Sequence, residues 1–317
     1  MDDLIFSFNV VMPIFLIIGL GYFIKLIGMV DQHFINTINK FNFRVGLSTL
    51  LFKNIYNTEL TKVFNPRLLI FTIVCITITV FGLWLIIPIF IKDNKKASAM
   101  IHTIFRSNFI LLGIPLAINM FGESNIAPIS FLVSIAIPTY NFFAVTILTV
   151  FDKSGYKNKT DRLKFSVINI IKNPLIIASI AGIIVQFFSL KLPSFAENAM
   201  SSVASLGTPL ALITLGTQLD FRKVVENLKY SIIATLGRLV VVPGIVVILA
   251  ILVGFRGYEL GGIFILFSSP SAISSYIMAQ EMNSDYKLTG DIVILTTFFS
   301  MFTIFIGIYL LKTFALI

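Results

Sequence analysis

Asn108 and Pro115 lie seven residues apart in an apolar stretch that is long enough to cross a bilayer. At this spacing the two residues share one face of a helix. The side-chain amide of Asn108 offers two hydrogen-bond donors and one acceptor, and leaving it unpaired in hydrocarbon costs several kcal/mol. The amide must therefore face protein, water or a polar guest. A hydrogen bond that joins two helices is the alternative to a binding role.

Pro115 follows Gly113 in the same stretch, and the pair predicts a break in the helix, because proline lacks the backbone donor and clashes with the preceding turn. Polar backbone freed by a break is tolerated at membrane depth only where it faces protein or a water-filled cavity. A second proline, Pro270, lies in the serine-rich stretch 268–275. Broken helices at matching places in two halves of a chain mark the binding sites of transporters.

The residues around Pro270 have the composition of a polar contact surface. Ser268, Ser271, Ser275 and Ala279 follow helical spacing and form one small, hydroxylated face. Such a face allows close helix packing, and its hydroxyls can equally bind a ligand, so both roles stay open. The helix segments that begin beyond each proline expose N–H groups and a partial positive charge. An anion, above all a carboxylate, suits that environment.

Candidates for coupling or gating are the charged residues near or within membrane depth, because ionisable side chains in a membrane are functional by default: Arg106, Arg238, Glu281 and Asp291. Snorkelling toward the cytoplasmic face is the alternative for Arg106, and an interfacial position is the favoured alternative for Glu281 and Asp291. Two histidines and one cysteine leave no usual zinc or haem ligand set. We therefore expect no metal centre and no cofactor, while coupling to Na⁺ or H⁺ stays open.

The composition is that of a polytopic membrane protein. Of the 317 residues, 57% are hydrophobic and only 12% are charged, and the mean hydropathy is +0.95. The chain starts with the acidic Met1-Asp2-Asp3 and continues with an apolar run past residue 20, which predicts a retained first helix instead of a signal peptide. The net charge of +9 is explained by basic loops beside membrane helices, so we expect no nucleic-acid partner.

Apolar windows of about 20 residues predict ten transmembrane spans. They lie at 4–27, 34–52, 68–91, 98–121, 126–151, 167–190, 196–219, 229–254, 258–280 and 290–314. With this topology 14 Lys and Arg residues fall on one side of the membrane and 6 on the other. The bias places the first side in the cytoplasm. Both termini are then outside, and residues 152–166 form a cytoplasmic linker between the five-span units 1–151 and 167–317.

Prolines and glycines recur between these two units. Two pairs lie 161 residues apart and two pairs lie 155 residues apart: Pro13 and Pro174, Gly46 and Gly207, Pro88 and Pro243, Pro115 and Pro270. Chance coincidence among eleven prolines is the alternative. If the repeat is real, an odd number of spans per unit places the two units in opposite orientation. The result is an inverted repeat whose binding site lies where the broken helices meet.

These motifs are similar to those of a known group of transporters. The sequence Asn108-x4-Gly113-Ile114-Pro115-Leu116 resembles the fourth-helix signature of the auxin efflux carrier family, which includes the plant PIN proteins and many bacterial permeases. The segment from Pro270 to Asn283 resembles the ninth-helix crossover of that family. The resemblance covers essentially the whole chain.

The resemblance implies an all-α fold with ten transmembrane helices in a 5+5 inverted repeat, related to the sodium/bile-acid symporter architecture. Spans one, two, six and seven would form a scaffold, often dimeric, and spans three to five and eight to ten a moving transport unit. Substrate would bind where spans four and nine cross, at residues that include Asn108, Gly113, Pro115, Ser269, Pro270, Ser271 and Ser274. Ser48 and Thr49 replace the Pro-Ala that the family often has before Leu-Leu-Phe, so they predict a more polar pocket on the scaffold side.

The function expected from these features is secondary transport of a small organic anion across the cell (plasma) membrane by an alternating-access, elevator-type mechanism. Bacterial members of the resembled family are linked to malate or malonate, and plant members to auxin. The alternative is a sodium- or proton-coupled symporter or antiporter of the bile-acid symporter or cation/proton antiporter type. An antiporter would require a carboxylate pair at the crossover, where Asn and Ser stand here. A membrane enzyme would require paired acids or histidines, and we expect no enzymatic activity.

Overall fold

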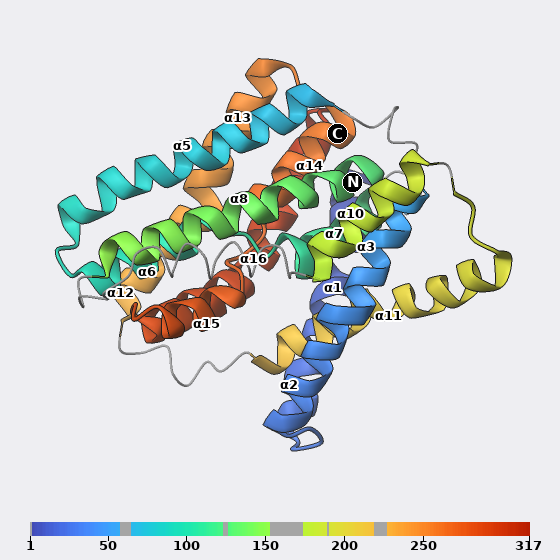
Figure 1. The fold of residues 1–317 in the computed structure, drawn as a ribbon. Helices are drawn as coiled ribbons and strands as arrows, with labels where there is room; N and C mark the ends of the chain where they lie inside the picture. The colour runs from blue at the N-terminus through green and yellow to red at the C-terminus, as the bar shows by residue number, and fades with distance from the viewer. Residues whose placement is uncertain (1, 58–64, 123–125, 153–173, 189, 219–226) are drawn as a thin grey trace.

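The computed structural model describes residues 2–57, 65–122, 126–152, 174–188, 190–218 and 227–317, which are helical apart from turns, short extended segments and one antiparallel bridge (Figure 1). The helices, in chain order, are α1 (Asp2–Leu26), α2 (Gln32–Phe41), α3 (Leu47–Tyr56), α5 (Pro66–Phe90), α6 (Asn94–Phe105), α7 (Ile114–Phe121), α8 (Ala127–Phe151), α10 (Pro174–Phe187), α11 (Ser194–Gln218), α12 (Leu228–Leu236), α13 (Val242–Val253), α14 (Gly257–Ser268), α15 (Ser274–Glu281) and α16 (Tyr286–Thr313). Three π-helical turns in these residues are η1 (Asn42–Gly46), η2 (Phe109–Gly113) and η5 (Gly237–Val241).

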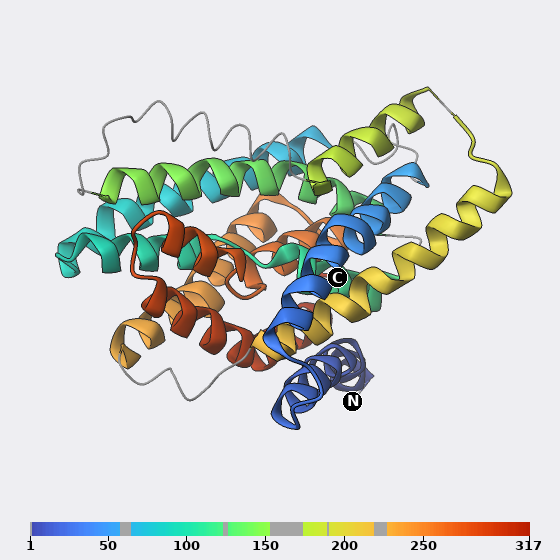
Figure 2. The same ribbon diagram turned by 60° about the horizontal axis from the view of Figure 1, so that its bottom comes forward.

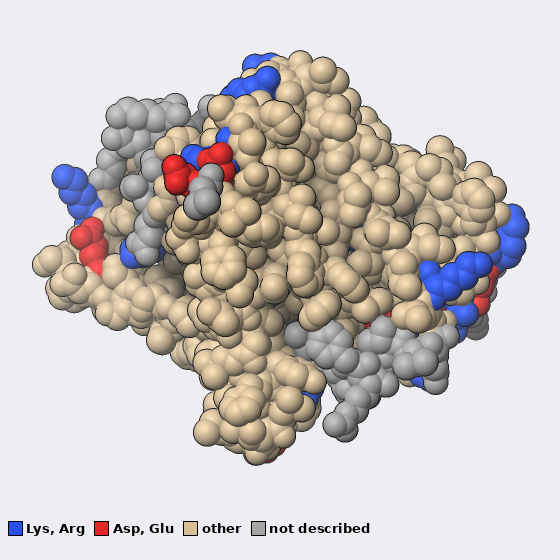
Figure 3. Space-filling view, turned by 180° about the vertical axis from the view of Figure 1, so that it is seen from behind, with Lys and Arg blue, Asp and Glu red and all other residues tan. Residues whose placement is uncertain are grey.

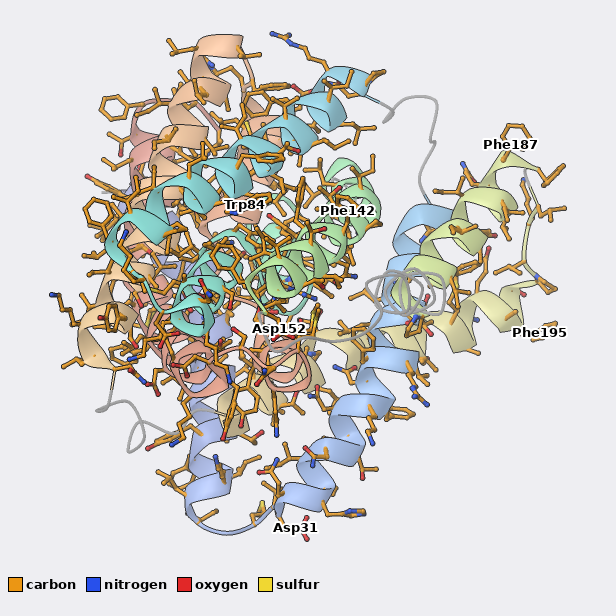
Figure 4. All side chains as sticks on the ribbon, turned by 60° about the vertical axis from the view of Figure 1, so that its left-hand side comes forward. Asp31, Trp84, Phe142, Asp152, Phe187 and Phe195 are labelled. Atoms are coloured by element: carbon orange, nitrogen blue, oxygen red, sulfur yellow. The ribbon has the colours of Figure 1, made fainter. Side chains whose placement is uncertain are left out.

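Acidic and amide side chains begin several of these helices by accepting hydrogen bonds from the first free N–H groups. Asp31, in the turn before α2, accepts from Phe34 N at 2.7 Å (Figure 4). Asp93 does the same for α6, and Asp285 does so for α16. These local signals set where the helices begin, and their apolar composition sets where they pack.

Five helical segments are long and apolar enough to cross a membrane, namely Asp2–Leu26, Pro66–Phe90, Ser194–Thr217, Leu228–Val253 and Tyr286–Thr313. Shorter apolar helices cover Phe109–Phe121, Ile135–Phe151 and Gly257–Ser268. The chain is therefore a helical, polytopic membrane protein, as the sequence predicts. Described helices fall in each of the ten predicted windows, while the number of spans and the inverted repeat stay predictions.

Large apolar side chains cover the outside of the molecule. Leu85 and Phe90 of α5 are 73% and 78% exposed, and Phe187 and Phe195 project at the outer ends of α10 and α11 (Figure 4). Most of the face in Figure 3 is uncharged, and its charged side chains gather in a few places. A water-soluble surface rarely has so large an apolar area, so this exterior suits lipid.

The helices form two groups (Figures 1 and 2). In the frame group, α3 packs on α10 and α11, and α1 packs on α11. The crossing group contains α5 to α8 and α12 to α16, in which α5 packs on α6 and α8, and α12 and α15 pack on α16. The groups touch through α1 with α7 and α16, α3 with α8, and α11 with η2. The assignment of these helices to a scaffold and a moving transport unit stays a prediction.

Glycines allow the backbones of the frame group to come close. A Cβ on Gly21 of α1 would collide with the carbonyl group of Ile213, and a Cβ on Gly216 of α11 would collide with that of Ile18. Each helix therefore presents a glycine to the backbone of the other. Such contacts replace the hydrophobic effect as the source of helix association where lipid surrounds the protein.

Contacts between distant segments define the two ends of the molecule. Lys312 Nζ lies 4.8 Å from the centre of the Phe6 ring, so both termini lie at one end. At the other end, Lys95 Nζ donates to Asn283 Oδ1 at 2.8 Å. That end carries the basic segments that the charge count assigns to the cytoplasm. The orientation itself stays a prediction, and the linker after Asp152 lies outside the described residues.

We predict that Gly21→Ala lowers the free energy of unfolding by roughly 1–3 kcal/mol, because the added methyl group must push α1 away from Ile213. Gly19→Ala, in the same helix, is the matched control, since no atom lies within 4 Å of its added Cβ. Thermal unfolding of the two purified variants measures the difference. Equal unfolding temperatures would show that the α1–α11 contact does not limit stability.

Candidate functional site

The first helix interruption lies at residues 106–108. Helix α6 ends at Phe105, Arg106 is extended (φ −82°, ψ 116°) and Asn108 precedes the turn η2, from which the helix continues into α7. The break predicted at Gly113–Pro115 is therefore misplaced by about two turns. Asn108, in contrast, lies in the interruption itself.

Pro115 does not break its helix because a π-helical turn precedes it. It lies in the first turn of α7, directly after η2. Pro243 follows η5 in the same way at the start of α13. A π-helical turn adds one residue, which displaces the carbonyl group that the proline ring would meet. The missing donor is thereby absorbed as a local distortion.

The second interruption lies around Pro270, as predicted. Helix α14 ends at Ser268, Ser269 is extended and α15 begins at Ser274. Pro270 has no N–H to donate to the carbonyl group of Leu266, four residues before it, so the helix cannot continue through it. The Leu266 oxygen then needs a donor from elsewhere.

The two interruptions meet and pair. Ser107 and Ser271 form an antiparallel bridge, in which Asn108 N donates to Pro270 O at 2.8 Å and Ala272 N donates to Arg106 O at 3.2 Å. Two segments more than 160 residues apart thus satisfy part of each other's exposed backbone. The expected meeting of two interrupted helices is confirmed, although Pro115 is not part of the paired segments.

Two serine hydroxyls cap the helix ends across the crossing. Ser107 Oγ donates to Leu266 O of α14 at 2.6 Å, and Ser271 Oγ donates to Thr103 O of α6 at 2.7 Å. Each interruption therefore supplies a donor to the helix end of the other. Sequence reasoning missed Ser107, and its place next to Asn108 was the available signal.

Arg238 joins both helix ends. It is fully buried, and Nε donates to Ser269 O at 2.8 Å. Nη1 donates to Ile104 O and Phe105 O at 3.1 and 3.2 Å, and Nη2 donates to Leu266 O at 3.3 Å. The C-terminal ends of helices carry partial negative charge, so the cation is attracted to both.

Arg106 is a second buried guanidinium beside the crossing. Its side chain is 8% exposed, so it does not snorkel into solvent. Nη2 donates to Asn141 Oδ1 at 2.8 Å, and Nη1 lies 3.4 Å from His102 Nε2 and contacts the Met278 sulfur. These partners carry no acidic group, so they do not neutralise the positive charge of Arg106.

Several buried polar atoms at the crossing have no hydrogen-bond partner in the described part of the chain. They include Asn108 Nδ2, Ser268 Oγ, Ser275 Oγ and His102 Nδ1. Asn108 is 5% exposed. Leaving buried donors unpaired costs about 1–3 kcal/mol each, so such atoms are rare outside functional sites. The crossing can therefore donate hydrogen bonds to a guest.

The other predicted binding residues occupy varied places. Ser269 Oγ donates to Ile265 O at 2.6 Å, Ser274 is exposed at the start of α15, and Gly113 packs between Phe109 and Ile265. Ser48 lies in α3 of the frame group, where its hydroxyl donates to Phe43 O at 3.0 Å, and Thr49 beside it is half-buried. Binding roles for all of them stay predictions.

The two acidic candidates differ in what the structure describes. Asp291 is 5% exposed within α16, so other parts of the protein bury it, and its depth in the membrane stays a prediction. The side chain of Glu281, at the end of α15, lies outside the described residues. Among the residues that are described, no group of three or more His, Cys, Asp or Glu side chains could hold a metal ion.

Comparison with known proteins identifies the family. A family model described as membrane transport protein matches residues 6–308. The chain belongs to the auxin efflux carrier family. An uncharacterized transporter of Methanocaldococcus jannaschii is 25% identical over 93% of this chain and 96% of its own length. A second uncharacterized transporter, from Methanothermobacter thermautotrophicus, is 21% identical over 93% of this chain and 95% of its own.

A third relative, named "putative malonate transporter", comes from Rhizobium meliloti and is 24% identical over 97% of both chains. These matches span nearly the full length of each protein, so the whole chain has the organisation of a transporter. The chain is a membrane transport protein and not an enzyme, and it is an integral membrane protein.

We predict that Ser271→Ala lowers the free energy of unfolding by about 1–3 kcal/mol, because Thr103 O loses its donor in a buried place. Thr77→Ala is the control, since Thr77 makes the same type of bond to Ile73 O on an exposed side of α5. Thermal unfolding of both variants compares the two hydroxyls. Equal losses of unfolding free energy in the two variants would show that the hydroxyl at the crossing stabilises the fold no more than an exposed one.

Proposed function

We propose that this protein is a secondary transporter of small organic anions that binds its substrate at the crossing of the interrupted helices. The observation that carries the proposal is the buried side-chain amide of Asn108, whose Nδ2 has no partner in the described chain. This amide, which must face a polar group, lies where the two interruptions meet, and such meeting points hold the substrate in transporters with broken helices.

The charges around the amide favour an anion. Arg106 lies in the first interruption, and the side chain of Arg238 contacts the helix ends at both. Both residues are buried, and the partners described above are carbonyl groups and neutral side chains. The helix of residues 109–121 also begins beside Asn108, with its first N–H groups and the positive end of its dipole at the crossing. A carboxylate accepts hydrogen bonds from amide and backbone donors and gains from this positive potential.

Short dicarboxylates are the first substrates to examine. The name of the Rhizobium meliloti relative indicates malonate for that protein, and the potential at the crossing suits the same class of ligand here. Malate and auxin-like monocarboxylates share the carboxylate group and complete the class. No nucleotide-binding loop of the Walker type occurs in the sequence, so ion and substrate gradients supply the energy.

The movement that we propose is a displacement of the crossing group against the frame group. The two groups meet where α1 packs on α7 and α16, and one polar contact there runs from Asn119 Nδ2 of α7 to Val10 O of α1 at 3.0 Å. A substrate carried at the crossing would move with α6, α7, α14 and α15. An elevator-type, alternating-access cycle requires the contacts at this boundary to break and form again in each turnover.

We further propose a place for the protein in the cell membrane, with both termini outside and the basic end in the cytoplasm. The described basic side chains that the charge count assigns to that end are Lys25, Lys40, Lys92, Lys95, Lys96, Lys229 and Lys287. A homodimer through the frame helices stays a prediction of the resemblance, because the exposed apolar faces of α1, α10 and α11 suit lipid as well as a second copy.

We predict that Asn108→Ala weakens carboxylate binding about 10- to 100-fold, because one hydrogen bond to a charged group is worth roughly 1.5–3 kcal/mol. Thermal-shift titrations with malonate, malate and indole-3-acetate on purified protein measure it, followed by uptake into vesicles. Asn36→Ala is the control, since Asn36 is exposed on α2. A folded Asn108→Ala variant with unchanged affinity and rate would remove Asn108 from the site.

We also predict that an inside-negative membrane potential accelerates export of a monoanion from loaded vesicles. One elementary charge that crosses about 100 mV gains about 2.3 kcal/mol. The measurement compares efflux with and without a potassium diffusion potential in vesicles that hold indole-3-acetate. An efflux rate that does not respond would mean that compensating ions move with the anion, so that transport is electroneutral.

A further inference from the structure

Arg238 makes an unusual set of contacts for a buried cation. Its guanidinium donates to the four carbonyl oxygens of Ile104, Phe105, Leu266 and Ser269 at 2.8–3.3 Å, and its side chain has no exposed surface. All four oxygens belong to the last turns of α6 and α14 or to the residue that follows. Backbone oxygens at the ends of two different helices therefore hold the cation, and the phenol of Tyr140 lies beside it.

A group of backbone carbonyl oxygens at helix ends can also bind a small metal cation. Transporters with interrupted helices bind Na⁺ through unwound backbone carbonyls and the C-terminal ends of half-helices, and carbonyl oxygens replace the hydration shell of alkali cations in channels. Two negative helix ends face each other here across a short distance, and they repel unless a positive charge lies between them. In this protein the positive charge belongs to a side chain.

We propose that Arg238 is a fixed counter-cation that occupies the place of a coupling ion, so that the crossing takes up no sodium together with the anion. The guanidinium stays attached to η5 through the cycle and is neither bound nor released. This role of Arg238 defines which ions the proposed transporter requires. The transport measurement below therefore rests on the proposed function. A fixed cation at this position argues against a sodium-coupled symporter mechanism for this site.

The backbone chemistry explains why a guanidinium suits the position. Pro270 cannot donate to Leu266 O, and the end of α6 leaves the carbonyl groups of Ile104 and Phe105 without helical donors. A guanidinium has five N–H groups in a rigid, planar arrangement and stays charged when buried. One side chain can thus supply donors to both helix ends and fix their separation. A lysine has the charge but not the spread of donors.

The first experiment uses the unaltered protein. Malonate, malate and indole-3-acetate are titrated in NaCl and in choline chloride at equal ionic strength and pH, and uptake of the best ligand into vesicles is measured in both. We expect affinities and rates that agree within about two-fold. A ten-fold or larger requirement for Na⁺ would overturn the inference and leave anion transport intact. If no anion acts in either salt, the proposed function fails, and the variants below decide the role of Arg238.

The second experiment removes the cation. Arg238→Ala leaves four carbonyl oxygens facing one another, so we expect an unfolding temperature at least about 5 °C lower in choline chloride. Part of that loss should be recovered, in a saturable way, by NaCl or methylguanidinium chloride. Arg238→Lys keeps the charge, so a smaller loss and no response to either added cation are expected.

Arg256→Ala is the matched control. Its Nη1 donates to the carbonyl groups of Ile251 and Phe255, but the side chain is exposed at the end of α13. We expect little loss and no response to cations. A loss in Arg238→Ala that neither cation reduces would identify a purely structural brace and overturn the inference. If Arg238→Ala does not fold, the comparison of NaCl and choline chloride with the unaltered protein decides.

Discussion

Buried helix ends must find hydrogen-bond donors for their last carbonyl groups, and this constraint shapes the centre of the molecule. Helices α6 and α14 both end inside the protein, where water and lipid headgroups cannot supply donors. The two ends solve the problem jointly, through the Ser107–Ser271 bridge, the serine hydroxyls and the guanidinium of Arg238. Within the described chain, the unpaired buried atoms at the crossing include the donor Nδ2 of Asn108 and the hydroxyls of Ser268 and Ser275, which can donate as well as accept. A site with carbonyls satisfied and donors free is selective for an acceptor, and a carboxylate is the strongest acceptor among small metabolites.

The sequence predicted the helical membrane architecture well, because apolar windows of bilayer length leave few alternatives. It also located the Pro270 interruption, since a proline within an apolar stretch removes a specific backbone donor. It misplaced the other interruption, because Pro115 carries the same signal but is accommodated by the turn η2. Whether a proline breaks a helix or bends it depends on the neighbouring backbone, which local sequence does not determine.

The roles of single side chains were harder to predict than the architecture. Arg238 was a candidate because a charge at membrane depth requires a partner. Its partners include backbone carbonyl groups on two other helices. Every residue has such a group, so the sequence does not indicate which ones bind the guanidinium. Ser107 and Asn141 were missed because their value comes from contacts with segments far away along the chain. Asn108 could be singled out as a candidate because an amide in hydrocarbon is costly wherever it packs.

The central claim is that a carboxylate binds at the crossing, within hydrogen-bond distance of Asn108. The most direct measurement is an experimental structure of the protein in lipid with saturating malonate or with the carboxylate that stabilises it most. We predict density for the anion about 2.7–3.1 Å from Asn108 Nδ2, between the frame and crossing groups. Anion density elsewhere in the molecule, or an Asn108 amide paired with protein in the bound state, would contradict the claim.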